Sequence, residues 1–439
     1  MRRLEGKKFS LSVQGCRTNQ YEGEAIAAAL EAAGAVRCDE SPDIFIIVSC
    51  TITAVADRKC RKIIRRARRE NPNAVIAACG CYAQKISEEE RKRLGLDIVV
   101  GNRLKEKLPE LMSECLADGA AKIEIIGEIE KEPRWDGLTL DRPRLHTRAF
   151  LKVQAGCSHY CAYCIVPSVR GRPVSRPIGE AVAAARRITE SGCPEIVLTG
   201  VHLGLHDDLP SLVKEIGSLP KIKRLRFGSI EPFAVNDELL KVLAETPSFC
   251  EHLHIPLQSG DDGVLSAMKR GYNTAEFAKI VRRAREALGE EVHISTDLMI
   301  GFPTEDESSF KRSLDFVKEI GFGKVHVFPY SPREGTAAAT LKPLDAATLR
   351  RRTAEALDLA SELHEKFCTR LIGENCDILI EERAKGTVRG YTRNFVKINA
   401  AAQSEINEEI SVVPVKYDSE ELFCEGVSAK TPAICGDNP

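Results

Sequence analysis

The 439-residue sequence lacks an excess of charge of either sign. It contains 63 lysines and arginines and 64 aspartates and glutamates, for a formal net charge of −1 at pH 7. This balance excludes a nucleic-acid binder that is basic over its whole surface, but it does not exclude local basic patches. With 43% hydrophobic and 29% charged residues, the chain has the composition of a folded globular protein. Its length corresponds to about two to four domains.

Long apolar segments are also missing. No apolar run approaches about 18 residues, so we expect no membrane-spanning helix and no membrane partner. The opening residues, MRRLEGKKFSLSVQ, carry charge but no apolar core of a signal peptide. We therefore expect a cytoplasmic protein whose thiols stay reduced.

Cysteine, by contrast, is abundant, with 16 in the chain. A secreted disulfide-bonded protein would usually be smaller and denser in cysteine. In a reducing compartment, clustered cysteines indicate metal or redox chemistry, whereas isolated ones are mostly small buried hydrophobes. Nine cysteines with no shared ligand spacing are expected to be structural: Cys38, Cys60, Cys115, Cys193, Cys250, Cys368, Cys376, Cys424 and Cys435.

Residues 1–118 alternate between apolar strands and helical patterns, and the fold class is α/β. Strands between helices predict a doubly wound parallel sheet that is covered on both faces. Residues 119–146 are rich in charge, glycine and proline and are interpreted as a linker. The expected strands are 8–13, 44–48 and 74–78, and the expected helices are 21–33, 57–70, 87–94 and 104–116.

Each of the three expected strands runs into a cysteine: Cys16, Cys50 and Cys81. In open α/β sheets, the loops at the carboxyl ends of the strands gather along one edge. These cysteines are 34 and 31 residues apart, so only the strand pattern predicts that they converge.

The strand–helix alternation restarts in residues 147–370. Six strand–helix units are two short of a closed eight-fold barrel, so we expect a partial (βα)6 barrel with its site at the carboxyl ends of the strands. Residues 371–433 are instead rich in short β segments and turns. They predict a small antiparallel β-barrel of about five strands, in the size class of nucleic-acid-binding barrels. The expected barrel strands are 150–154, 195–199, 224–228, 252–256, 292–299 and 324–328.

The strongest chemical signal is the motif Cys157-x3-Cys161-x2-Cys164, which directly follows the first barrel strand. Three thiolates on one tight loop can bind three irons of a [4Fe–4S] cluster and leave the fourth iron open to substrate. The alternative is a structural zinc site, which needs a fourth ligand at a matching spacing. His159 lies inside the loop and is poorly placed to supply it.

The residues around this motif, KVQAGCSHYCAYCIVPSVRGRPVSRP, closely resemble the methylthiotransferase family of the radical S-adenosylmethionine superfamily. The resemblance extends to GCRTNQYE, GCYAQ, LHIPLQSGDDGVLSAMKRGY, TDLMIGFP and VFPYSPREGT, and so to essentially the whole chain. It implies that an open iron binds S-adenosylmethionine, which one electron cleaves to methionine and a 5'-deoxyadenosyl radical. The C-terminal barrel resembles a TRAM domain, an RNA-binding module.

The resemblance also implies a second [4Fe–4S] cluster in the N-terminal domain, with Cys16, Cys50 and Cys81 as its ligands. Two molecules of S-adenosylmethionine are then used, one as methyl donor and one as radical source. An electron donor such as a flavodoxin or ferredoxin is implied, whereas the sulfur source is not identified. Cys79 departs from the family pattern and is a competing candidate, but Cys81 occupies the matching GCY frame.

The resemblance further places S-adenosylmethionine across the strand ends of the barrel. Its expected contacts are Tyr163 near the adenine, Gly200 beside the methionine part, and Ser229, Glu231 and Gln258 as polar groups. The alternative is that each is an ordinary polar or turn residue of a loop. No general base is nominated, because radical enzymes need little acid–base catalysis from the protein.

Three groups of basic residues flank these motifs. Phosphates favour such stripes, although a solvated helix face is the better interpretation of any single residue. Together they predict an RNA partner whose target base is splayed out of the stack. The candidates are Arg58, Lys59, Arg61 and Arg65, then Arg170, Arg172 and Arg176, then Arg383, Lys385, Arg389 and Arg393.

Within the family, GCRTNQYEGEAI looks most like the group that modifies N6-threonylcarbamoyladenosine at position 37 of tRNA, in the anticodon loop. The group acting on N6-isopentenyladenosine more often reads GCQMN, and the group acting on a ribosomal-protein aspartate reads GCPKN. Both remain alternatives. A rival from another class is a non-catalytic iron–sulfur RNA-binding protein, which the open fourth iron disfavours.

Overall fold

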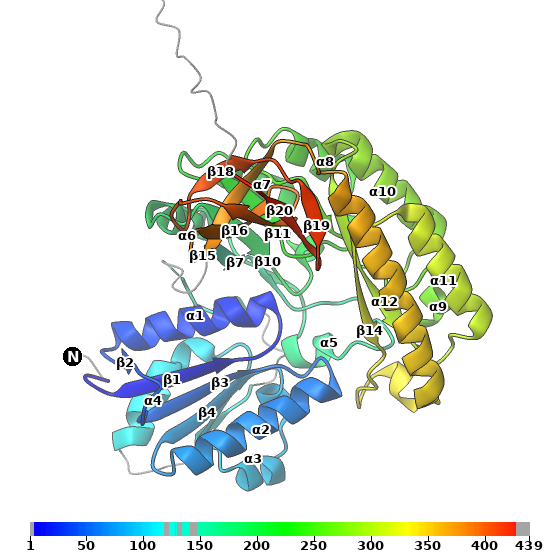
Figure 1. Cartoon of the computed structure of the whole chain (residues 1–439). Helices are drawn as coiled ribbons and strands as arrows, with labels where there is room; N and C mark the ends of the chain where they lie inside the picture. Colours follow the sequence, from blue (N-terminus) through cyan, green and yellow to red (C-terminus); the bar gives the residue numbers. More distant parts are fainter. Residues whose placement is uncertain (1–3, 118–122, 128, 130–133, 141–146, 427–439) are drawn as a thin grey trace, which may run out of the picture.

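The computed structural model describes residues 4–117, 123–127, 129, 134–140 and 147–426, which form three parts (Figure 1). Cys435 and the last residues of the predicted C-terminal domain, 427–433, lie outside the described residues. Within these ranges, no helix is both long and apolar enough to cross a membrane.

The N-terminal part is the predicted doubly wound parallel sheet, with strand order β2-β1-β3-β4-β5-β6. Helices α1 and α4 cover one face, and α2 and α3 cover the other (Figure 1). The sixth strand lies within the predicted linker, so that part of the linker belongs to the sheet. The elements are β1 (Lys8–Val13), α1 (Arg17–Ala32), β2 (Val36–Arg37), β3 (Ile44–Ser49), α2 (Ala54–Glu70), β4 (Val75–Gly80), α3 (Glu88–Leu94), β5 (Ile98–Val100), α4 (Leu108–Ala117) and β6 (Ile123–Ile125).

Helix α2 illustrates how the sequence builds this part. Thr53 caps it by accepting a hydrogen bond from the Ala56 backbone N–H at 3.1 Å. Cys60, Ile64 and Ala67 are its buried side chains and follow the 3.6-residue period. The arginines and lysines between them therefore face outward, next to the loop that carries Cys50.

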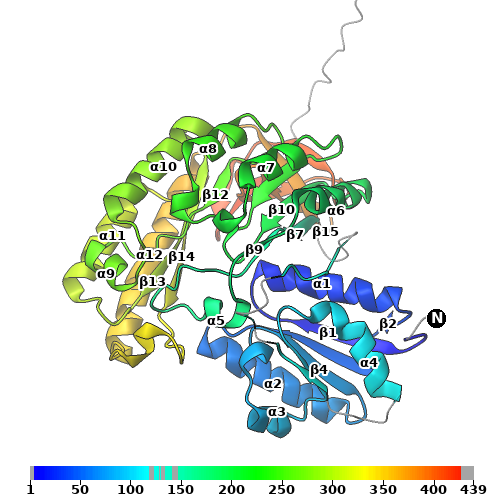
Figure 2. The same cartoon turned by 180° about the vertical axis from the view of Figure 1, so that it is seen from behind.

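The central part is a partial barrel of six parallel strands, as predicted. They form two three-stranded pieces, β11-β10-β7 and β12-β13-β14, joined by a bridge between Leu225 and Phe249. The helices lie around the outside (Figure 2). The strands are β7 (Arg148–Lys152), β10 (Glu195–Thr199), β11 (Arg224–Phe227), β12 (His252–His254), β13 (His293–Ile300) and β14 (Lys324–Pro329). The helices are α5 (Val166–Arg170), α6 (Ile178–Glu190), α7 (Leu209–Gly217), α8 (Asp237–Ala244), α9 (Asp262–Ala267), α10 (Thr274–Leu288), α11 (Glu307–Ile320) and α12 (Ala346–Thr369). A short pair, β8 (Gln154–Ala155) and β9 (Val174–Ser175), flanks the first strand.

The C-terminal part is a six-stranded sheet with its own apolar core, where about five strands were predicted. Its pairs are antiparallel except for β17 with β20, which is parallel. Its strands are β15 (Cys376–Ala384), β16 (Thr387–Thr392), β17 (Lys397–Ala401), β18 (Glu409–Val412), β19 (Lys416–Asp418) and β20 (Glu421–Cys424).

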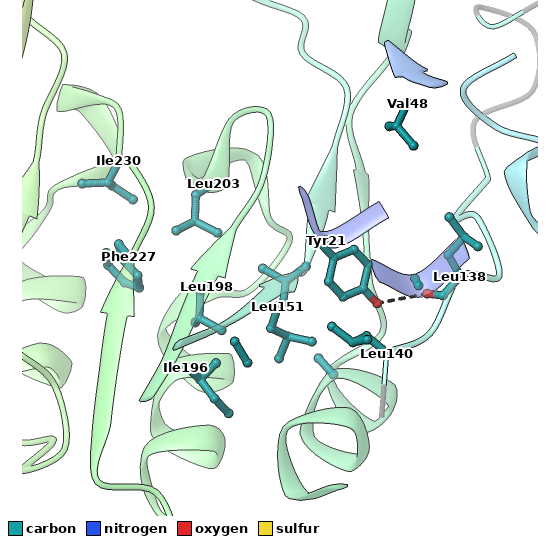
Figure 3. Close-up of a cluster of buried hydrophobic side chains, with 14 of the residues drawn as sticks. Tyr21, Val48, Leu138, Leu140, Leu151, Ile196, Leu198, Leu203, Phe227 and Ile230 are labelled. Atoms are coloured by element: carbon teal, nitrogen blue, oxygen red, sulfur yellow. Dashed lines mark hydrogen bonds between the residues drawn. The ribbon is translucent and has the colours of Figure 1, made fainter. Parts of the chain in front are cut away.

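One continuous apolar core joins the N-terminal part to the barrel (Figure 3). Tyr21 of α1 packs beside Leu151 of β7, and its hydroxyl donates a hydrogen bond to the Leu138 carbonyl at 3.1 Å. Burying an aromatic side chain and satisfying its hydroxyl stabilises this contact. The start of α1, and with it Cys16, is therefore placed against the barrel.

Candidate iron–sulfur and cofactor site

The barrel triad, Cys157, Cys161 and Cys164, lies on one loop between β8 and α5, and all three side chains are half-buried. Backbone hydrogen bonds hold the loop, including Cys157 N–H to the Gly171 carbonyl at 3.0 Å. Burial raises the pKa of Cys157 to about 11 and that of Cys164 to about 12. A metal would therefore have to displace protons from these thiols as it binds.

Gly156 lets the chain enter this loop. It has a φ of +78°, and a Cβ at this position would lie 2.1 Å from the Arg172 carbonyl oxygen. Only glycine fits both the conformation and the close approach.

Arg270 is a functional candidate that sequence reasoning missed. Its Nη1 lies 3.5 Å from Cys161 Sγ and 3.4 Å from Tyr163 Oη, and its guanidinium forms an ion pair with Glu231. Its Nε donates to Tyr272 Oη at 3.0 Å. A buried arginine thus connects one thiol of the triad to two predicted cofactor residues. The only sequence signal was its place in the MKRGY segment.

The five predicted cofactor residues all lie at carboxyl ends of barrel strands. Tyr163 and Gln258 line one cavity of about 220 Å³, together with Asp297, Met299 and Tyr330. Gln258 has a buried side-chain oxygen with no partner among the described residues, which is what a polar ligand could satisfy.

The other three predicted residues do not line this cavity. Gly200 follows β10, Ser229 follows β11, and Glu231 reaches the loop through Arg270. A Cβ on Gly200 would lie 2.9 Å from Gln154 Cβ, so the turn there is tightly packed. Their contact with S-adenosylmethionine stays a prediction.

The N-terminal triad comes from three separate strand ends. Cys16 is the exposed N-cap of α1, whereas Cys50 after β3 and Cys81 after β4 are buried. A Cβ on Gly15 would lie 2.6 Å from Cys50 Cβ, so the loop before Cys16 packs directly on Cys50. Cys81 N–H donates to the Ser49 carbonyl at 3.0 Å, which places it beside the Cys50 loop. The structure therefore brings the three loops together.

Cys79 and Cys81 have different environments. Cys79 is wholly buried within β4 and belongs to the apolar core of the sheet. Cys81 lies at the strand end, where Asn102 Nδ2 is 3.8 Å from its sulfur. This difference favours Cys81 as the ligand.

Arg170 connects the barrel to the N-terminal triad. It lies in α5, six residues after Cys164, and its Nε donates to Cys81 Sγ at 3.2 Å. Its Nη1 pairs with Glu22 Oε1 at 2.8 Å. The wholly buried Glu22 carboxylate also pairs with Lys105 and Lys152, at 2.7 and 2.8 Å. These cations hold the pKa of Glu22 well below its usual value despite burial, which alone would raise it.

Two of the predicted RNA contacts are wrong because their side chains are buried. Arg170 is engaged by Cys81 and Glu22, as described. Arg176 is 1% exposed, donates to Tyr21 Oη at 3.2 Å and lies over the Trp135 ring. Both arginines form contacts between the N-terminal part and the barrel. The sequence alone does not distinguish such buried arginines from those of a basic surface.

The remaining basic candidates differ in whether they are exposed and in whether an acidic residue already pairs with them. Arg58, Lys59, Arg65, Arg172, Arg383 and Lys385 are exposed. Arg61 lies 3.6 Å from Glu90, Arg389 pairs with Glu382 at 3.1 Å, and Arg383 pairs with Glu405. Arg393 donates to the Phe249 carbonyl at 2.6 Å and pairs with Glu251, so it docks the C-terminal part on the barrel.

The position of His159 disfavours the zinc alternative. Among the described residues, no three His, Cys, Asp or Glu side chains lie close enough together to bind a single metal ion. His159 instead stacks on His202 and Phe233, with ring centroids 4.8 and 4.4 Å away. The candidate fourth zinc ligand is therefore engaged in a ring stack, whereas a [4Fe–4S] cluster with one open iron needs only three thiols.

Two family models match separate parts of the chain. Residues 151–317 match the Radical SAM superfamily, and residues 8–101 match a family described as "Uncharacterized protein family UPF0004". Among solved structures, the radical S-adenosylmethionine methyltransferase TsrM from Kitasatospora setae has a TM-score of 0.59 and 16% identity, covering 76% of this chain and 77% of that one. This likeness shows a shared fold.

Curated relatives match nearly the whole chain. The threonylcarbamoyladenosine tRNA methylthiotransferase MtaB of Bacillus subtilis is 35% identical over 88% of both chains. MtaB of Thermotoga maritima is 32% identical over 97% of this chain and 99% of that one. A tRNA-2-methylthio-N(6)-dimethylallyladenosine synthase of Legionella pneumophila is 36% identical over 76% and 78%. The chain is therefore an enzyme that belongs to the family of radical S-adenosylmethionine tRNA methylthiotransferases.

Proposed function

We propose that this enzyme inserts a methylthio group at C2 of N6-threonylcarbamoyladenosine at position 37 of tRNA. The observation that carries the proposal is the position of the N-terminal triad against the barrel, where Arg170, six residues after Cys164, donates to Cys81 Sγ at 3.2 Å. The match to threonylcarbamoyladenosine methylthiotransferases over 88% to 97% of the chain supports the substrate.

Each triad would bind one [4Fe–4S] cluster. The cluster on Cys157, Cys161 and Cys164, when bound, supplies the electron that cleaves S-adenosylmethionine to its radical. Tyr163 and Gln258 line the adjoining cavity, which would orient the cofactor and exclude water from the radical. Arg270 keeps a positive charge beside Cys161 and pairs with Glu231.

Cys16, Cys50 and Cys81 would bind the second cluster, which handles the sulfur to be inserted. Arg170 donates a hydrogen bond to Cys81 Sγ and so places a positive charge beside this ligand. One S-adenosylmethionine donates the methyl group and a second supplies the radical. An electron donor such as a flavodoxin or ferredoxin would reduce the protein.

The RNA would bind across the outer face of α2 and the C-terminal part. Arg58, Lys59 and Arg65 are exposed on the helix that follows the Cys50 loop. The C-terminal sheet would act as a TRAM-like RNA-binding module, with Lys385 exposed in its first hairpin. Phosphate contacts of this kind position the RNA, and the flipped base provides the specificity.

A second candidate substrate is N6-isopentenyladenosine at the same position. The 36% identity to a dimethylallyladenosine-modifying relative favours it, although that match covers only 76% of the chain. The ribosomal-protein target and a non-catalytic iron–sulfur protein are the remaining alternatives.

The test is made on anaerobically reconstituted protein. Iron per chain is measured first, and tRNA nucleosides are then analysed by mass spectrometry after incubation with reductant and S-adenosylmethionine. About eight irons and a methylthio group on threonylcarbamoyladenosine are expected. Eight irons with product only on isopentenyladenosine would show that isopentenyladenosine is the substrate instead. Iron binding without formation of 5'-deoxyadenosine would support the non-catalytic alternative.

A further inference from the structure

A second cavity, of about 350 Å³, lies at the meeting point of all three parts of the protein. Arg17, the residue after Cys16, comes from the N-terminal part, and Tyr391 and Phe395 come from the C-terminal part. The barrel contributes a wall of imidazoles: His252, His254, His293 and His326, with His364 of α12 beside them. The volume falls in the range of ligand sites.

Arg17 is the cation of this cavity that forms no ion pair with a described residue. Burial lowers its pKa, and the more distant Glu195 and Asp297 offset this only in part. Its Nη1 donates to the Gly228 carbonyl at 2.6 Å, but no carboxylate of the described residues lies within 4.0 Å of it. The two lysines of the cavity are both paired, Lys324 with Glu420 at 3.8 Å and Lys397 with Glu421 at 2.8 Å. A half-buried charge without a partner is costly unless a ligand supplies the opposite charge.

The cavity adjoins the predicted cofactor cavity. His254 Nε2 lies 3.3 Å from Asp297 Oδ2, and Asp297 also lines the cavity of Tyr163 and Gln258. Gly228, which Arg17 contacts, directly precedes Ser229. A ligand beside Arg17 would therefore lie next to the cofactor cavity.

The imidazole wall adds neutral polar groups. Nδ1 of His252 and Nε2 of His293 are buried and have no hydrogen-bond partner among the described residues. Burial and neighbouring cations lower the pKa of both rings, that of His293 to about 3, so both stay neutral. A ligand here would meet one guanidinium free of an ion pair, two lysine–glutamate pairs and the uncharged rings of His252 and His293. This lining suits a single carboxylate with adjoining hydroxyl or amide groups.

We propose that Arg17 binds the carboxylate of the threonylcarbamoyl group when the target adenosine occupies this cavity. Arg17 would then determine specificity for a charged N6 substituent over an apolar isopentenyl one. The inference rests on the proposed function. A guanidinium and a carboxylate form paired, charge-assisted hydrogen bonds, whereas an apolar substituent would leave the guanidinium without a partner.

The test measures equilibrium binding without S-adenosylmethionine, so that no turnover occurs. Anaerobically reconstituted full-length enzyme is titrated with two labelled anticodon stem-loops, one with threonylcarbamoyladenosine and one with adenosine at position 37. Wild type is expected to prefer the modified RNA, and Arg17→Gln is expected to reduce that preference by about 10- to 100-fold. Arg17→Lys keeps the charge without the planar fork and is expected to retain part of the preference.

Lys59→Ala is the matched control, because Lys59 is exposed on α2 and would contact phosphate only. It should weaken both RNAs alike and leave the preference unchanged. Iron content and the visible spectrum of each Arg17 variant show whether both clusters assemble beside the substitution. If Arg17→Lys assembles them and Arg17→Gln does not, the comparison of preference is made with Arg17→Lys alone.

Three results would overturn the inference. The first is an unchanged preference for the modified RNA in Arg17→Gln. The second is an equal loss of affinity for both RNAs in that variant. The third is a wild-type enzyme that does not prefer the modified RNA at all. The first two leave the proposed function intact if wild type still methylthiolates threonylcarbamoyladenosine. The third, with product only on isopentenyladenosine, would refute the proposed substrate as well.

Discussion

The two cysteine triads are built in opposite ways. The barrel triad lies within eight consecutive positions of one loop, from Cys157 to Cys164, and backbone hydrogen bonds hold this loop in the barrel. The N-terminal triad needs three strand ends, 34 and 31 residues apart in sequence, to meet at one edge of a sheet. Each triad nevertheless has one thiol beside a buried arginine, Arg270 for the barrel and Arg170 for the N-terminal part.

This difference separates local from tertiary control of a metal site. A loop triad depends on the few residues that shape its loop, such as Gly156. A triad from strand ends depends on the stability of the whole sheet and on its contact with the barrel. The two sites should therefore respond differently to the same kind of perturbation.

The largest expected effect comes from removing each triad in turn. Replacing Cys157, Cys161 and Cys164 by alanine is expected to abolish 5'-deoxyadenosine formation, because no open iron remains to bind the cofactor. Replacing Cys16, Cys50 and Cys81 is expected to spare some cleavage and stop methylthiolation. In each variant, iron should fall from about eight to about four per chain. Full methylthiolation without the N-terminal triad would refute the division of roles.

The next effect compares the dependence of each triad on its fold. Ile46→Ala in the centre of β3 removes a wholly buried side chain and should destabilise the sheet by about 2–5 kcal/mol. Iron on the N-terminal triad should then be released at a lower urea concentration, measured in the variant that lacks the barrel triad. Iron on the barrel triad, measured in the complementary variant, should change much less.

The control for this experiment is Ile378→Ala, the same substitution at a wholly buried position of β15 in the C-terminal part. It should leave both iron-release curves close to those of wild type. An equal shift of both triads by Ile46→Ala would show that the two parts unfold as one unit and would break the comparison.

A smaller effect is expected from Arg170→Gln. The guanidinium hydrogen bond to Cys81 Sγ would stabilise the more negative, reduced state of a cluster bound at this thiol. Its loss should lower the reduction potential of the N-terminal cluster by about 60–130 mV, as measured by redox titration monitored by electron paramagnetic resonance. Arg172→Gln, two residues away and exposed, should leave the potential unchanged. A potential that does not move in Arg170→Gln would assign this arginine a purely structural role.

The smallest effect concerns the surface beside each triad. Arg58→Ala and Arg65→Ala on α2 should each weaken tRNA binding modestly and reduce the slope of log affinity against log salt by about 1. Arg172→Ala tests the surface beside the barrel triad in the same assay. Lys241→Ala on α8, which pairs with Glu245, is a remote control and should change neither value. Unchanged slopes for all three arginines would place the RNA elsewhere.

Much of the fold could be predicted from sequence periodicity. The buried segment IFIIVS became β3, and the six barrel strands were found in order, because apolar strands between amphipathic helices are a local pattern. The short strands β2, β5 and β6 were missed, since two or three residues are too few to show a period. The cluster-binding loop was also readable, because its three thiols are close in sequence.

The basic residues show the limit of that reasoning. Arg170 and Arg176 were taken for a surface patch, yet both are buried between the N-terminal part and the barrel. A sequence gives the charge of a side chain but not its partners, and Glu22 and Tyr21 lie about 150 residues away along the chain. Arg270 and Arg17 were overlooked for the same reason.

The sequence by itself determined the two alternating α/β parts, the small β-rich part and the loop of three cysteines. Each of these follows from neighbouring residues, whose period or spacing is set by the geometry of helices, strands and short loops. Only the tertiary structure decided that Cys16 and Cys50 meet Cys81, that Arg170 joins that triad to the barrel, and that Arg17 enters a cavity between three parts. The first of these contacts comes from strand ends that meet at one edge of the N-terminal sheet. The other two exist because packing Tyr21 and its neighbours against the barrel brings together residues that are far apart in the chain.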